Sequence, residues 1–443
     1  MIQESLLKKM HEQYAQNTKA QATGHAVASV GVIKATTDTE LLRRHPFTFS
    51  VEVKAGEITN QKQSGRCWMF ASLNAARIEV MQKLDMKTFE FSQCYPLFWD
   101  KLEKSNYFLE SIIDTYQEEI HSRLLDHLLK DPLQDGGQWD MFSGLLKKYG
   151  AVPKTLMPET ANSSATFAMD TYLTYKLQEY ACELRNKLRN GEKKETVIAR
   201  KEEMLTYIYQ VLCQCLGEPP QKFDFAYYDK DEKYHILKDQ TPVQFFNDYV
   251  GWDLDNKVSL IHAPTKDKPF NRRFTVKYLG SVKEGHPIDY VNVEMDVLKD
   301  ATIRQLKAGE GVWFGCDVGK FLDRENAIMD ERAHRYAEVF GEDLTLNKAE
   351  RLDYCSSLLT HAMVIAGVDL DENGKPKTWK IENSWGEHGP KKGIYSMSDA
   401  WFDQFTYEVM VDKKYVDQAV LDEAFKQDVI ELEPWDPMGS LAR

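Results

Sequence analysis

Apolar residues recur at helical spacing in the first half of the chain and at strand spacing in the second half. Helices are predicted over residues 1–20 and from Cys67 onward, where a largely apolar run begins. Two further stripes, at 173–188 and 204–215, are each followed by a glycine that predicts a helix end, so they favour a helical hairpin. Residues 21–60 are expected to be irregular, with short β-rich pieces.

From about residue 224 the pattern becomes typical of β-structure. Helix-rich sequence followed by strand-rich sequence predicts an α+β fold. The last stretch, 433–443, contains two prolines and a glycine and predicts an extended arm. Short apolar runs that predict buried strands lie at 274–278, 290–293, 311–319, 361–369, 378–385, 393–397 and 407–412.

Composition narrows the classes of protein that remain. The chain has 443 residues, with 56 Lys and Arg against 69 Asp and Glu, a net charge of −13 that disfavours nucleic acid as a general partner. No signal-peptide pattern opens the sequence, and no apolar run reaches the roughly 18 residues of a membrane span. Seven scattered cysteines suit a reducing compartment. We therefore expect a soluble, cytoplasmic protein with no membrane partner.

One segment resembles the start of a calcium-binding loop, with Asp369, Asp371, Asn373 and Gly374 in the first positions. Such a loop needs a bidentate glutamate at its twelfth position, and Lys380 stands there. A hairpin turn at Asn373-Gly374 is the better interpretation.

Other cofactor motifs are absent from the sequence. Cys213 and Cys215 lie two residues apart on a predicted helix, point in different directions and have no matching pair at zinc spacing. No Walker A loop, HExxH or GxSxG string occurs. We expect no metal and no organic cofactor.

The strongest candidate for chemistry is the segment QKQSGRCW at 61–68. A thiolate is the nucleophilic form of cysteine, and the positive end of a helix favours it. Cys67 begins a predicted helix after a Ser64-Gly65 turn, and Arg66 adds positive charge nearby. Gln61 is placed so that its amide and the Cys67 N–H would make two donors for an oxyanion.

This segment resembles the active site of papain-like cysteine peptidases, and its full form is similar to their bleomycin hydrolase and aminopeptidase C branch. Gly65 stands where papain itself has a cysteine, as in the branch. The resemblance continues at LTHAMV (359–364) and at NSWG (383–386), in the family's chain order of Gln, Cys, His and Asn. It also covers 91–110, 135–141 and 397–415, and so nearly the whole chain.

The resemblance implies a papain-like two-lobed fold, with helical insertions and a C-terminal arm, and roles for the matching residues. His361 would be the general base for Cys67, Asn383 would orient its imidazole, and Trp385 would cover that bond. The chain is then a single peptidase unit. Its expected parts are an N-terminal extension (1–60), a helical lobe (61–160), a helical insertion (161–225), a β lobe (226–430) and the arm in the cleft (431–443).

The resemblance also implies a cysteine aminopeptidase that acts on peptides with free N-termini and assembles as a homohexamer. Gly136 and Gly137 would line the cleft. The arm would leave room for about one substrate residue, with Ala442 or Arg443 at its end facing the substrate's ammonium group. We hypothesise that Arg443 is removed by the enzyme itself. Hydrolysis of drug amides such as bleomycin is compatible with this class.

Two other functions remain open on sequence alone. An arm that does not fill the cleft would leave a papain-like endopeptidase, which would cleave N-terminally blocked peptides. An oligomeric particle that binds nucleic acid is a different class, and salt-dependent retention on single-stranded DNA would distinguish it.

Overall fold

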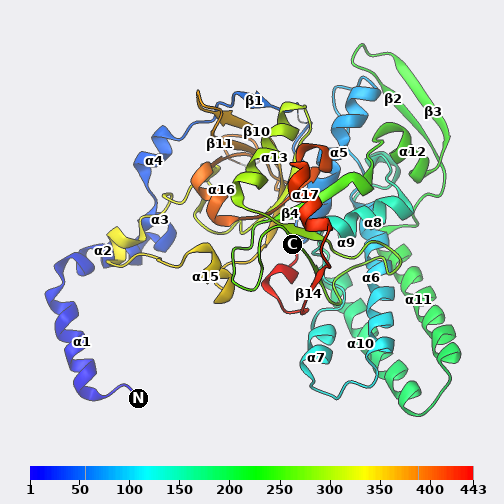
Figure 1. Cartoon of the computed structure of the whole chain (residues 1–443), viewed down its shortest axis with the longest axis horizontal. Coiled ribbons are helices and arrows are strands. Elements are labelled where there is room, and N and C mark those ends of the chain that lie inside the picture. The colour runs from blue at the N-terminus through cyan, green and yellow to red at the C-terminus, as the bar shows by residue number, and fades with distance from the viewer. Residues whose placement is uncertain (55, 388, 443) are drawn as a thin grey trace.

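The computed structural model describes residues 1–54, 56–387 and 389–442. Helix α5 (Cys67–Lys83) lies between a helical lobe and a β lobe (Figure 1). Every residue from Cys67 to Ile78 is buried, as expected for a helix that is apolar on all sides. It packs on α8 (Trp139–Tyr149) on one side and on strand β10 (His361–Leu370) on the other. The predicted helix start at Cys67 is confirmed.

The helical lobe is built around α6 (Cys94–Asp114), against which the hairpin of α10 (Phe167–Arg189) and α11 (Lys194–Leu216) packs (Figure 1). Both predicted helices of this hairpin are confirmed, and the glycines after them adopt positive φ. The other helical elements of this lobe are α7 (Arg123–Lys130), η1 (Lys154–Leu156) and α9 (Ala161–Ser164).

The β lobe contains one mixed sheet in the order β14-β5-β6-β4-β13-β7-β10-β11-β12-β9-β8, with β1 paired to β10. The predicted strands are confirmed, and Asn373-Gly374 forms the turn between β10 and β11. The strands are β1 (Val51–Glu52), β4 (Lys257–Ile261), β5 (Arg272–Val276), β6 (Tyr290–Asn292), β7 (Val312–Cys316), β8 (Leu322–Asp323), β9 (Ile328–Met329), β11 (Pro376–Glu382), β12 (Ile394–Ser398), β13 (Thr406–Asp412) and β14 (Ile430–Leu432).

Further helices surround the sheet, and the α+β class predicted from the pattern is confirmed. Helix α13 packs on β13 and β10, while α16 covers β11 and β12. These helical elements are η2 (Leu254–Asn256), α13 (Met295–Lys307), α14 (Tyr336–Phe340), α15 (Lys348–Asp353), α16 (Asp399–Phe405), η3 (Lys413–Tyr415) and α17 (Gln418–Phe425).

One hairpin lies on the helical side although it falls mostly within 226–430. Strands β2 (Phe223–Tyr228) and β3 (Tyr234–Gln240) lead into α12 (Pro242–Tyr249), which packs on α8 and α5. Its side chains Phe223, Phe225 and Tyr227 join the hydrophobic cluster that contains the core of the helical lobe. Apart from β1, the large sheet is built by the chain from β4 onward.

The N-terminal extension is more helical than predicted. It contains α1 (Glu4–Gln16), α2 (Thr18–Val30), α3 (Val32–Thr36) and α4 (Thr39–Arg44). The expectation of irregular structure was therefore wrong over 21–44. Helices α1 and α2 bury no residue, so they show no stripe set by core packing, and α1 reaches away from the rest of the chain (Figure 1).

The C-terminal arm returns from β14 to the junction of the two lobes. A short turn, η4 (Pro437–Gly439), interrupts the predicted extended course before Ser440–Ala442. Across the residues that the structure describes, no helix combines the length and apolar character that a bilayer crossing needs. All seven cysteines are free thiols.

Candidate active site

Cys67 is the first residue of α5, and its side chain is completely buried. The turn before it is held from the helical lobe, because the Gly65 N–H donates to Asp135 Oδ2 across 2.7 Å. Trp68 Nε1 donates to the Asp135 carbonyl across 2.7 Å. One residue therefore fixes the turn and the first helical residue after the thiol.

Burial dominates the electrostatics of this thiol. It raises the pKa of Cys67 to about 12, while backbone N–H groups of Ala362, Trp68 and Cys67 itself oppose the shift. The helix N-terminus therefore does favour the thiolate, as the sequence indicated, but by less than burial disfavours it.

Arg66 does not act on the thiol as its position in the sequence indicated. Its guanidinium is buried and makes a bidentate contact with Glu159, with nitrogen–oxygen distances of 3.1 and 2.7 Å. Arg66 Nε also donates to Ser64 Oγ across 2.9 Å. Its charge is compensated by the carboxylate, and its role here is to brace the turn before Cys67.

His361 and Asn383 meet because β10 and β11 are antiparallel neighbours, with His361 beginning one and Asn383 following the other. His361 Nε2 and Asn383 Oδ1 are 3.0 Å apart. The Trp385 ring lies against the imidazole, with centroids 4.9 Å apart. Burial lowers the pKa of His361 to about 4, the Asn383 hydrogen bond opposes this, and the charge of Arg324 lowers it further.

The thiol and this pair come together between the lobes. The Ala362 N–H that interacts with the Cys67 sulfur belongs to the residue directly after His361, and α5 packs on β10. Cys67, His361 and Asn383 are therefore neighbours, as the sequence predicted.

Gln61 lies at the same junction. Its backbone N–H donates to the Ser384 carbonyl across 2.8 Å, and its side-chain oxygen accepts from Ser384 Oγ across 2.7 Å. Its Nε2 donates to the Ser64 carbonyl across 2.7 Å, which uses one of two N–H groups. The side-chain amide of Gln61 is thus held between the turn that precedes Cys67 and the end of β11, which Asn383 follows.

The arm lies along the helical side of the junction. The Gly137 N–H donates to the Ala442 carbonyl across 3.1 Å in an antiparallel bridge, and Ala442 is completely buried. Gly136 is next to this contact, but its carbonyl accepts from Lys104 Nζ across 2.7 Å. Arg443 lies outside the described residues.

Several residues that hold the arm were missed by sequence reasoning. Gln138 Nε2 donates to the Ser440 carbonyl across 2.5 Å, and Ser440 Oγ donates to the Leu359 carbonyl across 2.7 Å. Tyr290 donates to the Met438 carbonyl across 3.3 Å. The position of Gln138 beside two glycines was a usable signal, whereas Tyr290 reads as an ordinary core aromatic.

A cavity of about 530 Å³ opens beside the turn that precedes Cys67. Its floor includes Gln61 and Gly65, and α10 forms its far wall. Asp170 on that wall pairs with buried Lys101 across 2.9 Å, and Lys101 also pairs with Asp135 across 2.8 Å. The helical hairpin therefore shapes the space next to the thiol.

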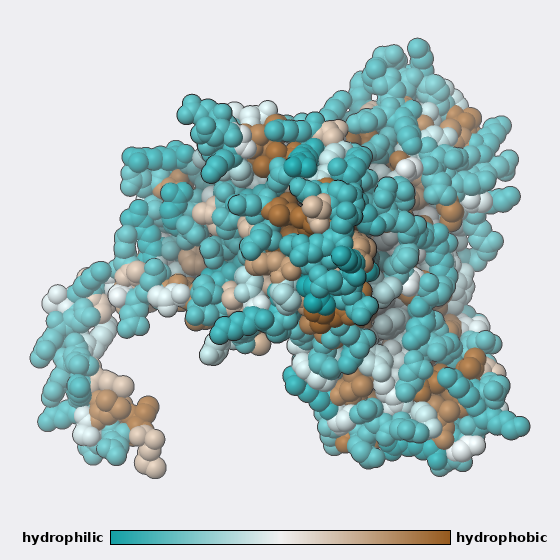
Figure 2. Space-filling model, viewed as in Figure 1, coloured by the Kyte–Doolittle hydropathy of each residue, from teal (hydrophilic) through white to brown (hydrophobic). Residues whose placement is uncertain are grey.

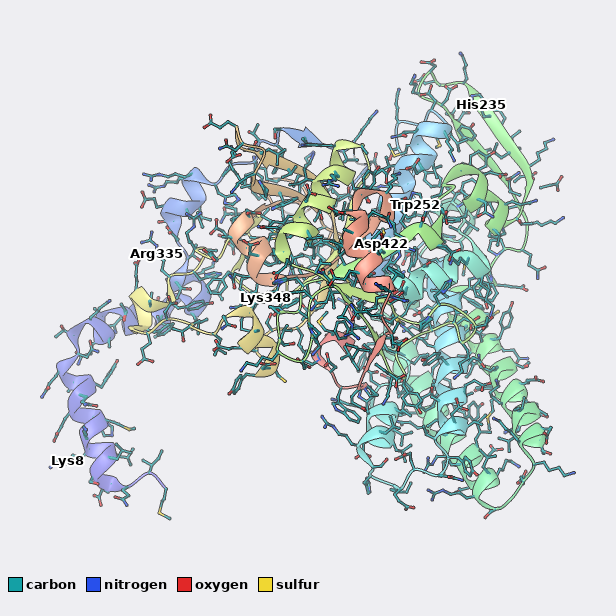
Figure 3. The ribbon with its side chains drawn as sticks, viewed as in Figure 1. Lys8, His235, Trp252, Arg335, Lys348 and Asp422 are labelled. Carbon is teal, nitrogen blue, oxygen red and sulfur yellow. The ribbon has the colours of Figure 1, made fainter. Side chains whose placement is uncertain are left out.

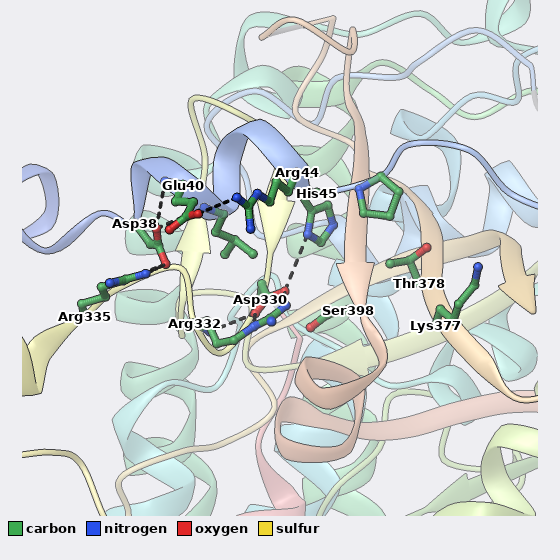
Figure 4. A pocket seen from close by; sticks show the side chains of 12 residues that line it. Asp38, Glu40, Arg44, His45, Asp330, Arg332, Arg335, Lys377, Thr378 and Ser398 are labelled. Carbon is green, nitrogen blue, oxygen red and sulfur yellow. Dashed lines mark hydrogen bonds and ion pairs between the residues drawn. The ribbon is translucent and has the colours of Figure 1, made fainter. Parts of the chain in front are cut away.

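Another cavity, of about 510 Å³, lies on the β lobe under α4 (Figure 4). Two ion pairs lie at this cavity: Arg335 with Asp38 at 2.7 Å, and Arg332 with Asp330 at 2.9 Å. The Arg335–Asp38 pair fastens the N-terminal extension to the β lobe.

A Ser-His-Asp arrangement beside that cavity lacks the features of a nucleophile. His45 lies 2.9 Å from Ser396 Oγ and 3.6 Å from Asp330. Ser396 is completely buried, and its hydroxyl donates to the Pro46 carbonyl across 2.7 Å. The serine proton is already engaged, so the trio is a structural clip. Within 1–54, 56–387 and 389–442, no group of three His, Cys, Asp or Glu side chains is arranged to hold a metal.

Comparisons with known proteins agree with this geometry. The model of the peptidase C1-like family matches residues 1–439. The chain is 52% identical over 394 residues to aminopeptidase C of Listeria monocytogenes, covering 89% of this chain and 88% of that protein. It is 42% identical over 404 residues to bleomycin hydrolase of Gallus gallus, covering 90% and 89% of the two chains.

A solved structure, that of PepW from Lactobacillus rhamnosis, has the same fold. Its TM-score is 0.97 at 46% identity, with 100% of this chain and 99% of that chain covered.

Proposed function

The chain belongs to the peptidase C1-like family, and we propose that it is a cysteine aminopeptidase that releases N-terminal residues from peptides. The observation that carries this proposal is the meeting of the Cys67 thiol with the His361–Asn383 pair at a junction partly filled by the chain's own arm. The names of the relatives, aminopeptidase C and bleomycin hydrolase, support it.

The proposed reaction is acyl transfer through a thioester. The thiol proton of Cys67 passes to His361, and the sulfur attacks the carbonyl carbon of the substrate. The Cys67 N–H and the Gln61 amide stabilise the oxyanion. His361 then protonates the leaving amine, and water activated by the same imidazole hydrolyses the thioester.

Asn383 and Trp385 act on this reaction through the imidazole. A hydrogen bond to Asn383 Oδ1 fixes the Nε2–H tautomer and turns the other ring nitrogen toward the thiol. Trp385 lies on the ring and shields the bond from water. Because burial favours the neutral thiol and imidazole, proton transfer would accompany substrate attack instead of preceding it.

The arm supplies the proposed restriction to N-termini. It occupies the edge of Gly137, where an extended peptide would otherwise pair, and its contacts to Gln138 and Leu359 hold it there. A substrate then has room for about one residue before the scissile bond. Gly136 would contribute to the cleft wall by positioning Gly137, which follows it in the chain and pairs with the arm.

Hydrolysis of free-amino aminoacyl amides by wild type and Cys67→Ala tests the reaction. We expect the variant to lose at least about a thousandfold in kcat. Cys94→Ala is the matched control, because Cys94 is also a buried thiol at the start of a helix in the same lobe. Undiminished hydrolysis by Cys67→Ala would overturn the mechanism.

Removal of residues 438–443 tests the arm. We expect the shortened protein to gain activity on N-terminally blocked peptides, which the full chain should cleave poorly. Rapid cleavage of blocked peptides by the full chain would favour the alternative, a papain-like endopeptidase. The same assay can include bleomycin as a drug amide.

We also propose that the protein assembles as a homohexamer in the cytoplasm. Helix α1 supports assembly, because its apolar side chains are exposed and gather near its free end (Figure 2), while Lys8 extends into solvent far from either lobe (Figure 3). Light scattering should give about six chains per particle. A monomer would contradict this part of the proposal.

A further inference from the structure

The arm leaves one edge of the proposed site free. The last residues of the arm, from Met438 to Ala442, make their hydrogen bonds beside the site with Gly137, Gln138, Leu359 and Tyr290. The opposite edge, where Trp385 bridges to Asn60, has no such contact among the described residues. If the proposed function holds, the acyl part of the substrate lies toward the arm, and the leaving product lies toward Trp385.

A guanidinium stands on this free edge. Arg324, in the turn between β8 and β9, lies over the Trp385 ring with its Cζ atom 4.4 Å from the centroid. The Trp385 ring also contacts the His361 ring, with centroids 4.9 Å apart, and the Tyr395 ring, with centroids 6.1 Å apart. The guanidinium of Arg324 and the imidazole of His361 therefore both contact the same indole.

The charge of Arg324 is not compensated. No carboxylate lies within 4 Å of its guanidinium among residues 1–54, 56–387 and 389–442. The nearest acids in sequence are engaged elsewhere: Asp323 accepts from the Asn326 backbone and side chain, and Glu325 pairs with Lys34 at 3.9 Å. The charge is felt at the site, since it lowers the pKa of His361.

We propose that Arg324 binds a carboxylate of the leaving product. This carboxylate belongs either to an acidic side chain on the first residue of the leaving peptide or to the C-terminus of a single leaving amino acid. The stacked guanidinium is held in place before substrate arrives, and it offers two parallel donors to a carboxylate. Arg324 is thus a specificity residue for the residue after the scissile bond.

Two pairs of substrates separate the two sources of carboxylate. Ala-Glu-Phe amide against Ala-Gln-Phe amide tests the side chain, and Ala-Gln against Ala-Gln amide tests the C-terminus. Because Arg324 is exposed, we expect a preference of about threefold in kcat/KM for the acidic member of at least one pair. The ratio within a pair is the measurement, so that any common loss of activity cancels.

Arg324→Gln should reduce the ratio to about one, and Arg324→Glu should invert it. Arg332→Gln is the matched control, because Arg332 is an exposed arginine of the same lobe whose guanidinium pairs with Asp330. Its ratio should equal that of wild type. A ratio unchanged in Arg324→Gln, or lowered equally in Arg332→Gln, would overturn the proposal.

The test is distinct from the test of the proposed function. If wild type hydrolyses none of the four substrates, the aminopeptidase proposal itself fails. If it hydrolyses them with ratios near one in every variant, the aminopeptidase proposal stands and the role of Arg324 is wrong.

Discussion

The Gly137 N–H donates to the Ala442 carbonyl across 3.1 Å, and the space that permits this contact is set by Trp68. A Cβ at Gly137 would lie 2.5 Å from the Trp68 ring, which is itself fully buried beside Cys67. The bare backbone at this position therefore serves both the pairing with the arm and the packing behind the thiol.

Gly137→Ala is expected to force the indole or the backbone to move. We predict a loss of about 1–3 kcal/mol in the free energy of unfolding and a lower kcat/KM, because Trp68 is adjacent to Cys67. Urea denaturation and amide hydrolysis measure the two effects. Gly144→Ala is the control, since its Cβ would meet only Val282 at an ordinary 3.4 Å and alanine favours a helix. Equal stability of both variants would contradict the argument.

Asn383→Ala should lower kcat while KM changes less, because the imidazole loses its orienting hydrogen bond. We predict a fall in kcat of about 100-fold. Asn373→Ala, at the far end of the same β10–β11 hairpin, should leave kcat unchanged. A parallel loss in both variants would mean that the hairpin, and not the hydrogen bond, sets the rate.

Asn383→Asp tests the same contact through pH. A carboxylate beside His361 favours the imidazolium, so it raises the pKa of that imidazole. The low-pH limb of the rate profile should then move to higher pH, because His361 must be neutral to accept the proton of the Cys67 thiol. A limb that stays in place or moves to lower pH would contradict this role.

Arg66→Met distinguishes a bracing role from an electrostatic one. Removing the arginine leaves Glu159 partly buried without its partner, and we predict a loss of about 3 kcal/mol in the free energy of unfolding. Arg66→Met with Glu159→Leu should recover much of this loss. The pH dependence of Cys67 alkylation should stay the same, because the charge of Arg66 is already compensated. A large upward shift of that profile would restore the interpretation drawn from sequence.

The sequence predicted the parts of the site that depend on local pattern and chain order. Cys67 at a helix start, His361 at a strand start and Asn383 after the next strand all have local signatures, and the sheet register brings the last two together. The cost of burying the thiol was not predictable, because it depends on how the two lobes and the arm close over it.

Contacts between distant segments were also beyond the sequence. Asp135 holds the turn before Cys67 from 70 residues away, and Arg66 is paired with Glu159 at a separation of 93 residues. The helix over residues 1–20 was predicted and contains α1, but most of α2 was missed for the opposite reason. Helix α2 buries no residue, so no buried stripe marks it.

Glu408 on β13 gives a prediction about pH and stability. Its carboxyl is completely buried, neither oxygen has a well-formed hydrogen bond among the described residues, and burial raises its pKa to about 8, with Ser259 opposing and Asp140 adding to the shift. The folded state therefore keeps a proton that the unfolded chain releases near the ordinary value of 4.5. This contribution to stability is fully present below about pH 4.5 and is lost as pH rises through 8.

Glu408→Gln mimics the protonated form, so its stability should be close to that of wild type near pH 5 and exceed it by about 4 kcal/mol near pH 8.5. Urea midpoints across this range measure the difference, with Glu338→Gln as an exposed control. Parallel pH profiles for wild type and Glu408→Gln would show that this carboxyl does not set the stability of the folded chain.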